Sequence, residues 1–159
     1  MRRRTCVTLL VLSFISACES NNESMDIDEL TNFANRYAAS WSGQDPIAHS
    51  MFYAEDGTLR VNDGEPAVGR AAVEATARSF MTGFPDMVVR LVELRRVEDK
   101  IQFHWHWTGT NTGPGGNGAF VDLKGYEEWT LNADGLILYS QGHYDEDEYQ
   151  RQLAAGSQK

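Results

Sequence analysis

Alternating apolar and polar residues in the last third of the chain predict three antiparallel strands. Their predicted ranges are Ile101–Thr110, Ala119–Leu131 and Leu136–Tyr144. In the first of them Phe103, Trp105 and Trp107 share one face, and His104 and His106 share the other. Period-two alternation with large aromatic residues is typical of a half-buried strand. Because burying three aromatic rings outweighs burying two imidazoles, we expect the aromatic side chains to face the core.

The second of these strands carries an acid on its apolar face. Glu127 shares that face with Leu123, Gly125 and Trp129. A carboxyl group in an otherwise apolar wall indicates a pocket, although an ordinary core explains the aromatic residues just as simply. The predicted ligand-binding residues are Phe103, Trp105, Trp107, Trp129 and Tyr144.

The rest of the chain predicts further elements of one α+β domain. Helices are predicted at Ile27–Ser42, Pro46–Phe52, Ala71–Thr82 and Asp145–Leu153, and strands at Thr58–Val61 and Met87–Val97. The first helix has apolar residues at helical spacing, and a proline begins the second. Residues 154–159 are expected to be a frayed tail. We find no repeat and no second domain.

The amino terminus has the order of segments found in an export signal. Three arginines are followed by the apolar run Val7–Ile15 and then by Ile15-Ser16-Ala17-Cys18. The run is too short for a membrane-spanning helix, so residues 1–17 are predicted to be a signal peptide. The final residues resemble the lipobox of bacterial lipoproteins, which predicts lipidation of Cys18 and a tether over residues 18–26. An ordinary signal peptide is the alternative.

Charge and cysteine content exclude several kinds of partner. The formal net charge is −9, and loss of the leader arginines leaves 11 basic against 23 acidic residues, or −12. Such a surface disfavours nucleic acid. Cys6 would leave with the leader and Cys18 would carry the lipid, so the domain has no thiol for a disulfide or metal. His104 and His106 have no third ligand fixed by spacing, so we predict no metal and no cofactor.

The order of elements and several short segments resemble the SnoaL-like proteins of the nuclear transport factor 2-like superfamily. The segments are Phe52–Thr58, Gly69–Val73, Pro85-Asp86, Thr108–Thr110 and Asp134–Ile137. The resemblance covers residues 27–153 and implies a cystatin-like cone, in which a strongly bent antiparallel sheet wraps around about three helices and encloses an apolar pocket. It does not fix an activity, because relatives include polyketide cyclases and ketosteroid isomerases as well as binding proteins.

Two enzyme families of this fold can be compared with the chain at the positions that carry their chemistry. Similarity to ketosteroid isomerases implies an oxyanion-binding pair at Tyr37 and Glu127, but the position of their base is Val61. The acid of the SnoaL-like cyclases falls on Gly142. Asp63, two residues beyond Val61, is a candidate displaced base, although Asp63-Gly64 is also an ordinary turn. Glu127 could instead form an ion pair with an arginine, namely Arg36, Arg70 or Arg90.

These observations leave two functions open. The first is a pocket for a small hydrophobic, carbonyl-bearing molecule, with isomerase-, cyclase- or dehydratase-type chemistry. The second is a non-catalytic lipoprotein that binds a ligand or a partner. The expected location is the periplasmic side of the cell envelope, anchored by lipid, and Glu19 after the cysteine favours the outer membrane. A homodimer through the outer face of the sheet is a candidate assembly.

Overall fold

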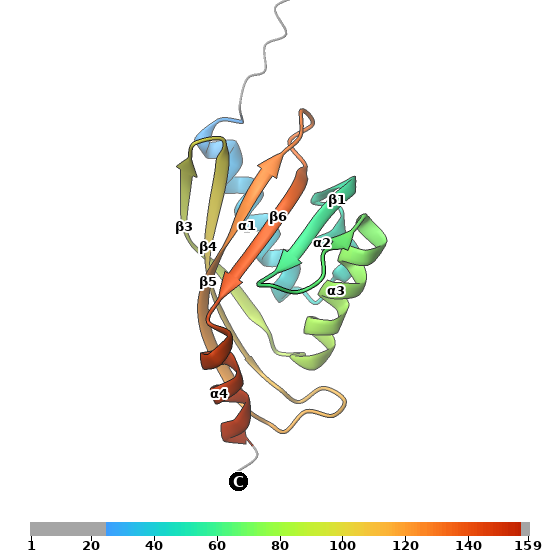
Figure 1. The fold of residues 1–159 in the computed structure, drawn as a ribbon, viewed down its shortest axis with the longest axis vertical. Coiled ribbons are helices and arrows are strands. Elements are labelled where there is room, and N and C mark those ends of the chain that lie inside the picture. The colour runs from blue at the N-terminus through green and yellow to red at the C-terminus, as the bar shows by residue number, and fades with distance from the viewer. Residues whose placement is uncertain (1–24, 157–159) are drawn as a thin grey trace, which may run out of the picture.

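The computed structural model describes residues 25–156, which form six strands and four helices (Figure 1). In chain order the elements are α1 (Ile27–Ser42), α2 (Pro46–Ser50), β1 (Tyr53–Val61), β2 (Ala67–Val68), α3 (Arg70–Gly83), β3 (Val88–Val97), β4 (Lys100–Thr110), β5 (Phe120–Leu131), β6 (Ile137–Tyr144) and α4 (Glu146–Gly156). The predicted leader and Cys18, the predicted site of lipidation, lie outside the described residues.

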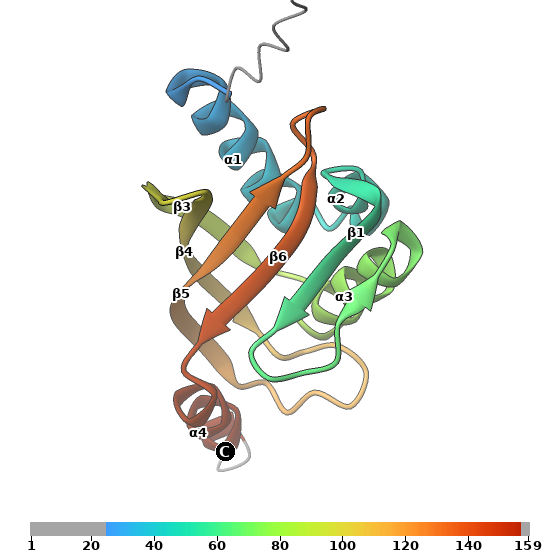
Figure 2. The same cartoon turned by 45° about the horizontal axis from the view of Figure 1, so that its top comes forward.

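The six strands form one bent sheet that is covered by helices on one face. The strand order is β2-β1-β6-β5-β4-β3, and α1 packs against β3 while α3 packs against β1. Figure 2 shows β1, β6 and β5 crossing in front of α1, α2 and α3, with α4 beyond the end of the sheet. The concave face therefore encloses the interior, and the predicted α+β cone is confirmed.

Burial follows the predicted alternation in β4. Phe103, Trp105 and Trp107 are 0%, 9% and 5% exposed, whereas His104 and His106 on the other face are only half-buried. Helix α1 has the predicted bounds, and Asp26 caps it by accepting hydrogen bonds from the first-turn backbone. The predicted apolar face of this helix is the buried one.

The sheet differs from the expectation in two respects. It is mixed, because β1 runs parallel to β6 while the other pairs are antiparallel. Strand β1 begins at Tyr53 and not at Thr58, and its register against β6 shifts between these two residues. Gly57 lies inside that shift, where an added Cβ would come within 2.6 Å of the Ile137 carbonyl oxygen. This irregularity disrupts the alternation that would have revealed the first half of β1.

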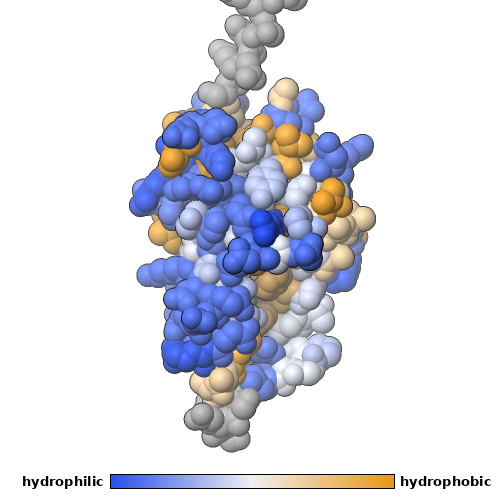
Figure 3. Space-filling view, in the orientation of Figure 1, coloured by the Kyte–Doolittle hydropathy of each residue, from blue (hydrophilic) through white to orange (hydrophobic). Residues whose placement is uncertain are grey.

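The face shown in Figure 3 is mainly hydrophilic, with small separate apolar areas and a continuous polar surface over α4. Within residues 25–156 no helix combines the length and hydrophobicity needed to cross a membrane. The largest cluster of apolar side chains is buried between the sheet and the helices, so a site for a hydrophobic ligand is expected on the concave side of the sheet.

Candidate functional site

Three positions identified from the sequence lie side by side across the sheet. Val61 on β1 pairs with Gly142 on β6, and Gly142 pairs with Glu127 on β5. All three line the same cavity. The positions matched by resemblance to the bases of the two enzyme families therefore lie in one row on the same side of Glu127, and here they carry a valine and a glycine.

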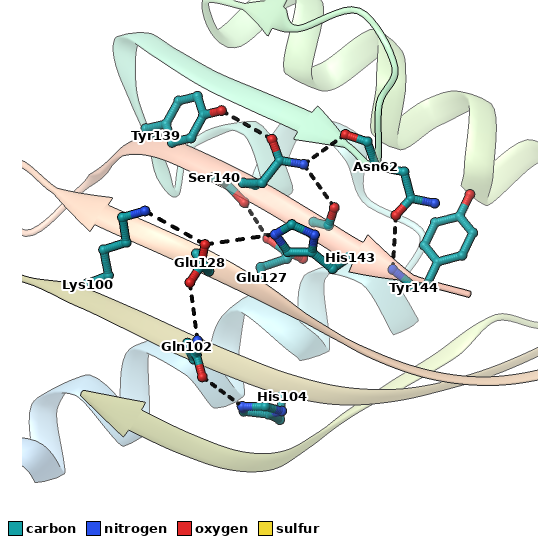
Figure 4. A network of polar contacts seen from close by, with 12 residues as sticks. Asn62, Lys100, Gln102, His104, Glu127, Glu128, Tyr139, Ser140, His143 and Tyr144 are labelled. Atoms are coloured by element: carbon teal, nitrogen blue, oxygen red, sulfur yellow. Dashed lines mark hydrogen bonds and ion pairs between the residues drawn. The ribbon is translucent and has the colours of Figure 1, made fainter. Parts of the chain in front are cut away.

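One oxygen of Glu127 is held by three hydrogen-bond donors. Oε2 accepts from the Tyr37 hydroxyl at 2.8 Å, from Trp129 Nε1 at 2.9 Å and from Ser140 Oγ at 2.7 Å. The Tyr37 hydroxyl also lies 2.9 Å from the Tyr53 hydroxyl. Figure 4 shows Ser140 pointing at Glu127 from the neighbouring strand. The donors come from α1, β5 and β6, so tertiary structure fixes the orientation of the carboxyl group.

The other oxygen of Glu127 faces the cavity. Among the described residues no side chain or backbone group donates a hydrogen bond to Oε1, and Glu127 is one of the residues lining the cavity. The side chain is 7% exposed. A polar group of a bound molecule would therefore meet Oε1, whose direction is set by the three contacts of Oε2.

Burial has the largest effect on the pKa of the Glu127 carboxyl group. Loss of hydration raises the pKa of the Glu127 carboxyl, while the three hydrogen bonds act in the opposite direction. Burial and the nearby carboxyl also raise the pKa of Tyr37 and of Tyr53. Both phenols are therefore neutral donors at ordinary pH.

The arginines considered as ion-pair partners do not reach Glu127. Within the described part of the chain Glu127 takes part in no ion pair. Arg36 and Arg90 are exposed, and Arg70 donates from Nε to the Tyr53 carbonyl at 2.8 Å. The carboxyl group is therefore buried without a cationic neighbour.

The cavity is small and almost entirely apolar. Its volume is about 70 Å³, and it is lined by Trp41, Leu59, Val61, Phe80, Met87, Val89, Trp105, Trp107, Glu127, Gly142 and Tyr144. Gly125 allows the Trp105 ring, part of the cavity wall, to lie against the backbone of β5, because a Cβ at Gly125 would lie 2.5 Å from that ring. A Cβ at Gly142 would make ordinary contacts, the nearest at 3.5 Å. The site can thus accept a side chain where the cyclases have their acid.

The predicted ligand-binding residues divide into two groups. Trp105, Trp107 and Tyr144 line the cavity. Phe103 and Trp129 lie outside its lining and stack on each other with ring centroids 4.8 Å apart, in contact with Tyr37. This second group supports Glu127 and does not contact the space available to a ligand.

The predicted catalytic residues are also separated. Tyr37 is fully buried and outside the cavity lining, so its hydroxyl supports Glu127 and does not aim beside it at a ligand. Asp63 is exposed in the turn that follows β1 and lies in a polar groove on the outside of the sheet. The structure therefore does not bring Asp63 to Glu127.

Two members of the network were not identified from the sequence. Tyr53 is the first residue of β1 and is fully buried. Ser140 precedes Gly142 by two residues and so shares its face of β6. That spacing was a readable signal for Ser140, whereas Tyr53 lies before the part of β1 that the pattern predicted.

The opposite face of the sheet carries a separate polar network (Figure 4). Glu128 accepts from Gln102 at 3.2 Å, and the Tyr126 ring stacks between His104 and His143 at centroid distances of 5.3 and 4.6 Å. In residues 25–156 no group of three or more potential ligands is placed to hold a metal ion.

Comparisons with known proteins agree with this architecture. A search of the curated proteins found no match to this chain. Solved structures of similar fold include TsrD from Streptomyces laurentii, with 19% identity, a TM-score of 0.71 and coverage of 83% of this chain and 99% of that one. A putative SnoaL-like polyketide cyclase from a Jannaschia species has 18% identity and a TM-score of 0.69, and the match covers 79% of this chain and 91% of that one.

A third structure is a hypothetical protein with a ketosteroid isomerase-like fold from Catenulispora acidiphila in complex with trimethylamine. It has 18% identity and a TM-score of 0.67, and the match covers 77% of this chain and 92% of that one. At these identities the structures establish the fold alone. The family model of the SnoaL-like domain matches residues 34–140, which is well over half of the chain. The chain therefore belongs to the SnoaL-like domain family.

Proposed function

We propose that this domain binds a small hydrophobic, carbonyl-bearing molecule in the cavity beside Glu127. The observation that carries the proposal is the placement of Glu127 Oε1 in an otherwise apolar space, with Oε2 fixed by three donors. An apolar cavity with one or a few positioned polar groups is typical of small-molecule sites. The Catenulispora neighbour, which holds trimethylamine, supports small organic molecules as ligands of this fold.

The carboxyl group would meet a carbonyl in its protonated form. Burial raises the pKa of Glu127, which favours that form. With Oε2 already accepting three hydrogen bonds, the proton belongs on Oε1 and can be donated to the ligand oxygen. A donor of this kind functions best about 2.7–3.1 Å from the oxygen that develops negative charge.

We expect this site to bind its ligand but to convert it slowly. The positions that carry the base in related enzymes are Val61 and Gly142, neither of which can accept a proton. Isomerase-, cyclase- or dehydratase-type chemistry that needs a second acid or base is therefore expected to be slow. Glu127 alone remains to hold or move a proton.

The second candidate function is a non-catalytic lipoprotein of the cell envelope that binds a partner. The outer sheet face favours it, because the rings of His104, Tyr126 and His143 stack on one another there and remain partly exposed. A second copy of the domain is the partner we propose for this face. Export, lipidation at Cys18 and attachment to the outer membrane remain part of the proposal and rest on the sequence.

The test is a titration of wild type, Glu127→Ala and Glu128→Ala with small cyclic ketones, followed by tryptophan fluorescence. Trp41, Trp105 and Trp107 line the cavity and should report its occupation. We expect Glu127→Ala to weaken binding and Glu128→Ala, which removes the same charge from the outer face, to leave it unchanged. Equal affinities of the three proteins, or no binding by wild type, would overturn the proposal.

A variant that restores the base separates binding from catalysis. Val61→Asp places a carboxyl group at the position of the ketosteroid isomerase base, beside the same cavity. If only the base is missing, this variant should accelerate isomerisation of a β,γ-unsaturated ketone that wild type binds but converts slowly. Binding without any gain in rate would leave the domain as a binding protein.

A further inference from the structure

Glu127 is a buried carboxyl group without a cationic neighbour. Buried carboxylates are normally paired with a cationic side chain. Here three donors converge on Oε2, yet in residues 25–156 Glu127 belongs to no ion pair, and no lysine, arginine or histidine lines its cavity. A cation that neutralises Glu127 would therefore have to come from outside the chain.

The three hydrogen bonds to Oε2 favour the ionised carboxyl group, whereas burial favours the protonated one. A hydrogen bond to an ionised oxygen is shorter and about twice as strong as one to a neutral oxygen. Tyr37, Trp129 and Ser140 donate to Oε2 at 2.7–2.9 Å, so all three contacts become stronger when the carboxyl group is ionised. Ionisation in an apolar cavity is costly unless an opposite charge lies beside the free oxygen.

The walls of the cavity are suited to such a charge. Five aromatic residues surround the space next to Oε1, namely Trp41, Phe80, Trp105, Trp107 and Tyr144. Aromatic ring faces attract ammonium groups, and tryptophan does so most strongly. The protein also has a net charge of −9, which raises the local concentration of cations around it.

We propose that the cavity binds a small organic ammonium ion, whose N–H donates to Glu127 Oε1 and whose alkyl groups pack against the aromatic walls. This inference rests on the proposed ligand site and adds a second chemical class of ligand to it. The charged carboxylate takes the ammonium ion, and the protonated acid takes the carbonyl compound. The protonation state of one buried group thus selects between two kinds of molecule.

Other titratable groups around Glu127 do not change charge near neutral pH. Tyr37 and Tyr53, from α1 and β1, have a raised pKa, as does Tyr144 in the cavity wall. His49 on α2 packs on the Tyr37 ring, and burial lowers its pKa to about 3. A pH dependence of binding between pH 5 and 8 would therefore report on Glu127.

The experiment compares three probes with the same ring and different polar groups: cyclopentylamine, cyclopentanol and cyclopentanone. At pH 8 the amine, as its cation, should bind wild type about tenfold more tightly than the neutral alcohol. Its affinity should rise from pH 5 to pH 8 while that of the ketone falls. Equal affinities of amine and alcohol, or an amine affinity independent of pH, would overturn the inference.

Variants assign the effect to the cavity. Glu127→Gln should abolish the preference for the amine, and Glu128→Gln, which removes one charge from the outer face, should preserve it. Val61→Lys supplies an internal ammonium group beside Glu127 and should block the amine. This variant keeps the inference testable even if Glu127→Gln folds poorly. An amine that still binds Val61→Lys as tightly as wild type contradicts the assignment.

The two proposals can fail separately. Ketone binding that depends on Glu127 without any preference for the amine would leave the proposed function in place and remove the ammonium site. Amine binding that is lost in Glu127→Gln, without ketone binding, would establish the ammonium site and remove the carbonyl ligand. If no probe binds wild type, both proposals fall.

Discussion

Replacing Tyr37 by phenylalanine tests whether the hydrogen bonds to Glu127 stabilise a charged group. The substitution keeps the ring, which packs edge-on against Phe103 and Trp129, and removes only the hydroxyl. Two contacts are lost, at 2.8 Å to Glu127 Oε2 and at 2.9 Å to the Tyr53 hydroxyl. A bond to a charged acceptor contributes about 1.5–3 kcal/mol and a neutral one about 0.5–1.5 kcal/mol.

The expected loss in unfolding free energy for Tyr37→Phe is therefore about 2–4.5 kcal/mol. The matched control is Tyr53→Phe, which removes the hydroxyl–hydroxyl contact but leaves the bond between Tyr37 and Glu127, and should cost about 0.5–1.5 kcal/mol. The loss for Tyr37→Phe should also grow with pH. The missing donor favours the carboxylate, so its removal raises the pKa of Glu127 further.

Urea denaturation of both variants and wild type at pH 5 and pH 8 measures these differences. A cost of Tyr37→Phe no larger than that of Tyr53→Phe, at both pH values, would show that the Tyr37 hydroxyl does not stabilise a charged carboxyl group. Glu127 would then be a neutral acid whose contact with Tyr37 is an ordinary hydrogen bond, and it would offer no charge to an ammonium ligand.

Two further predictions rest on this geometry, and a third rests on the sequence of the leader. Trp105→Ala should cost about 3–5 kcal/mol of unfolding free energy, because it empties a large buried site, whereas His104→Ala on the outer face should cost less than about 1 kcal/mol; comparable losses would contradict the assignment of faces. Burial raises the folded-state pKa of Glu127 above its ordinary value of 4.5, so its contribution to stability is full below that pH and declines as pH rises through the raised pKa. Wild type should therefore lose stability relative to Glu127→Gln as pH rises from 4 to 8, and an unchanged difference would be evidence against the shift. Cys18→Ser should release the domain from membranes, which fractionation measures; wild type found in the soluble fraction would contradict lipidation.

The elements with regular burial were predictable from the sequence. Helix α1 and strand β4 each present one face to the same core, so their apolar residues recur at helical spacing or strictly alternate. Burial of large apolar side chains is the main force that stabilises the fold, and it leaves a regular pattern wherever an element has one buried face. The bounds of α1 were predicted correctly, and those of β4 to within one residue.

The elements with irregular pairing were not predictable in the same way. Strand β2 has two residues and no buried position, so it leaves no pattern. The first half of β1 contains exposed Glu55 and Asp56 and the register shift at Gly57. There the backbone pairing with β6 determines the structure, and such pairing depends on residues about 80 positions later in the chain.

In the candidate site, the sequence predicted which face of an element each residue lies on, but not how deeply its side chain is buried. An acid between apolar residues on β5 was enough to single out Glu127, and the resemblance to two enzyme families singled out Val61 and Gly142. The structure is what brings the three together. The role of Tyr37 was not accessible, because periodicity gives the face of α1 that is buried but not how deeply each side chain lies. In the structure Tyr37 lies behind the carboxyl group, together with Trp129, and outside the cavity. This position turns an expected pair of ligand donors into one ligand-facing oxygen with a fixed orientation. The chemistry of the site then depends on the charge of a single carboxyl group, which is why its protonation state, and not a second catalytic residue, should determine what the domain binds.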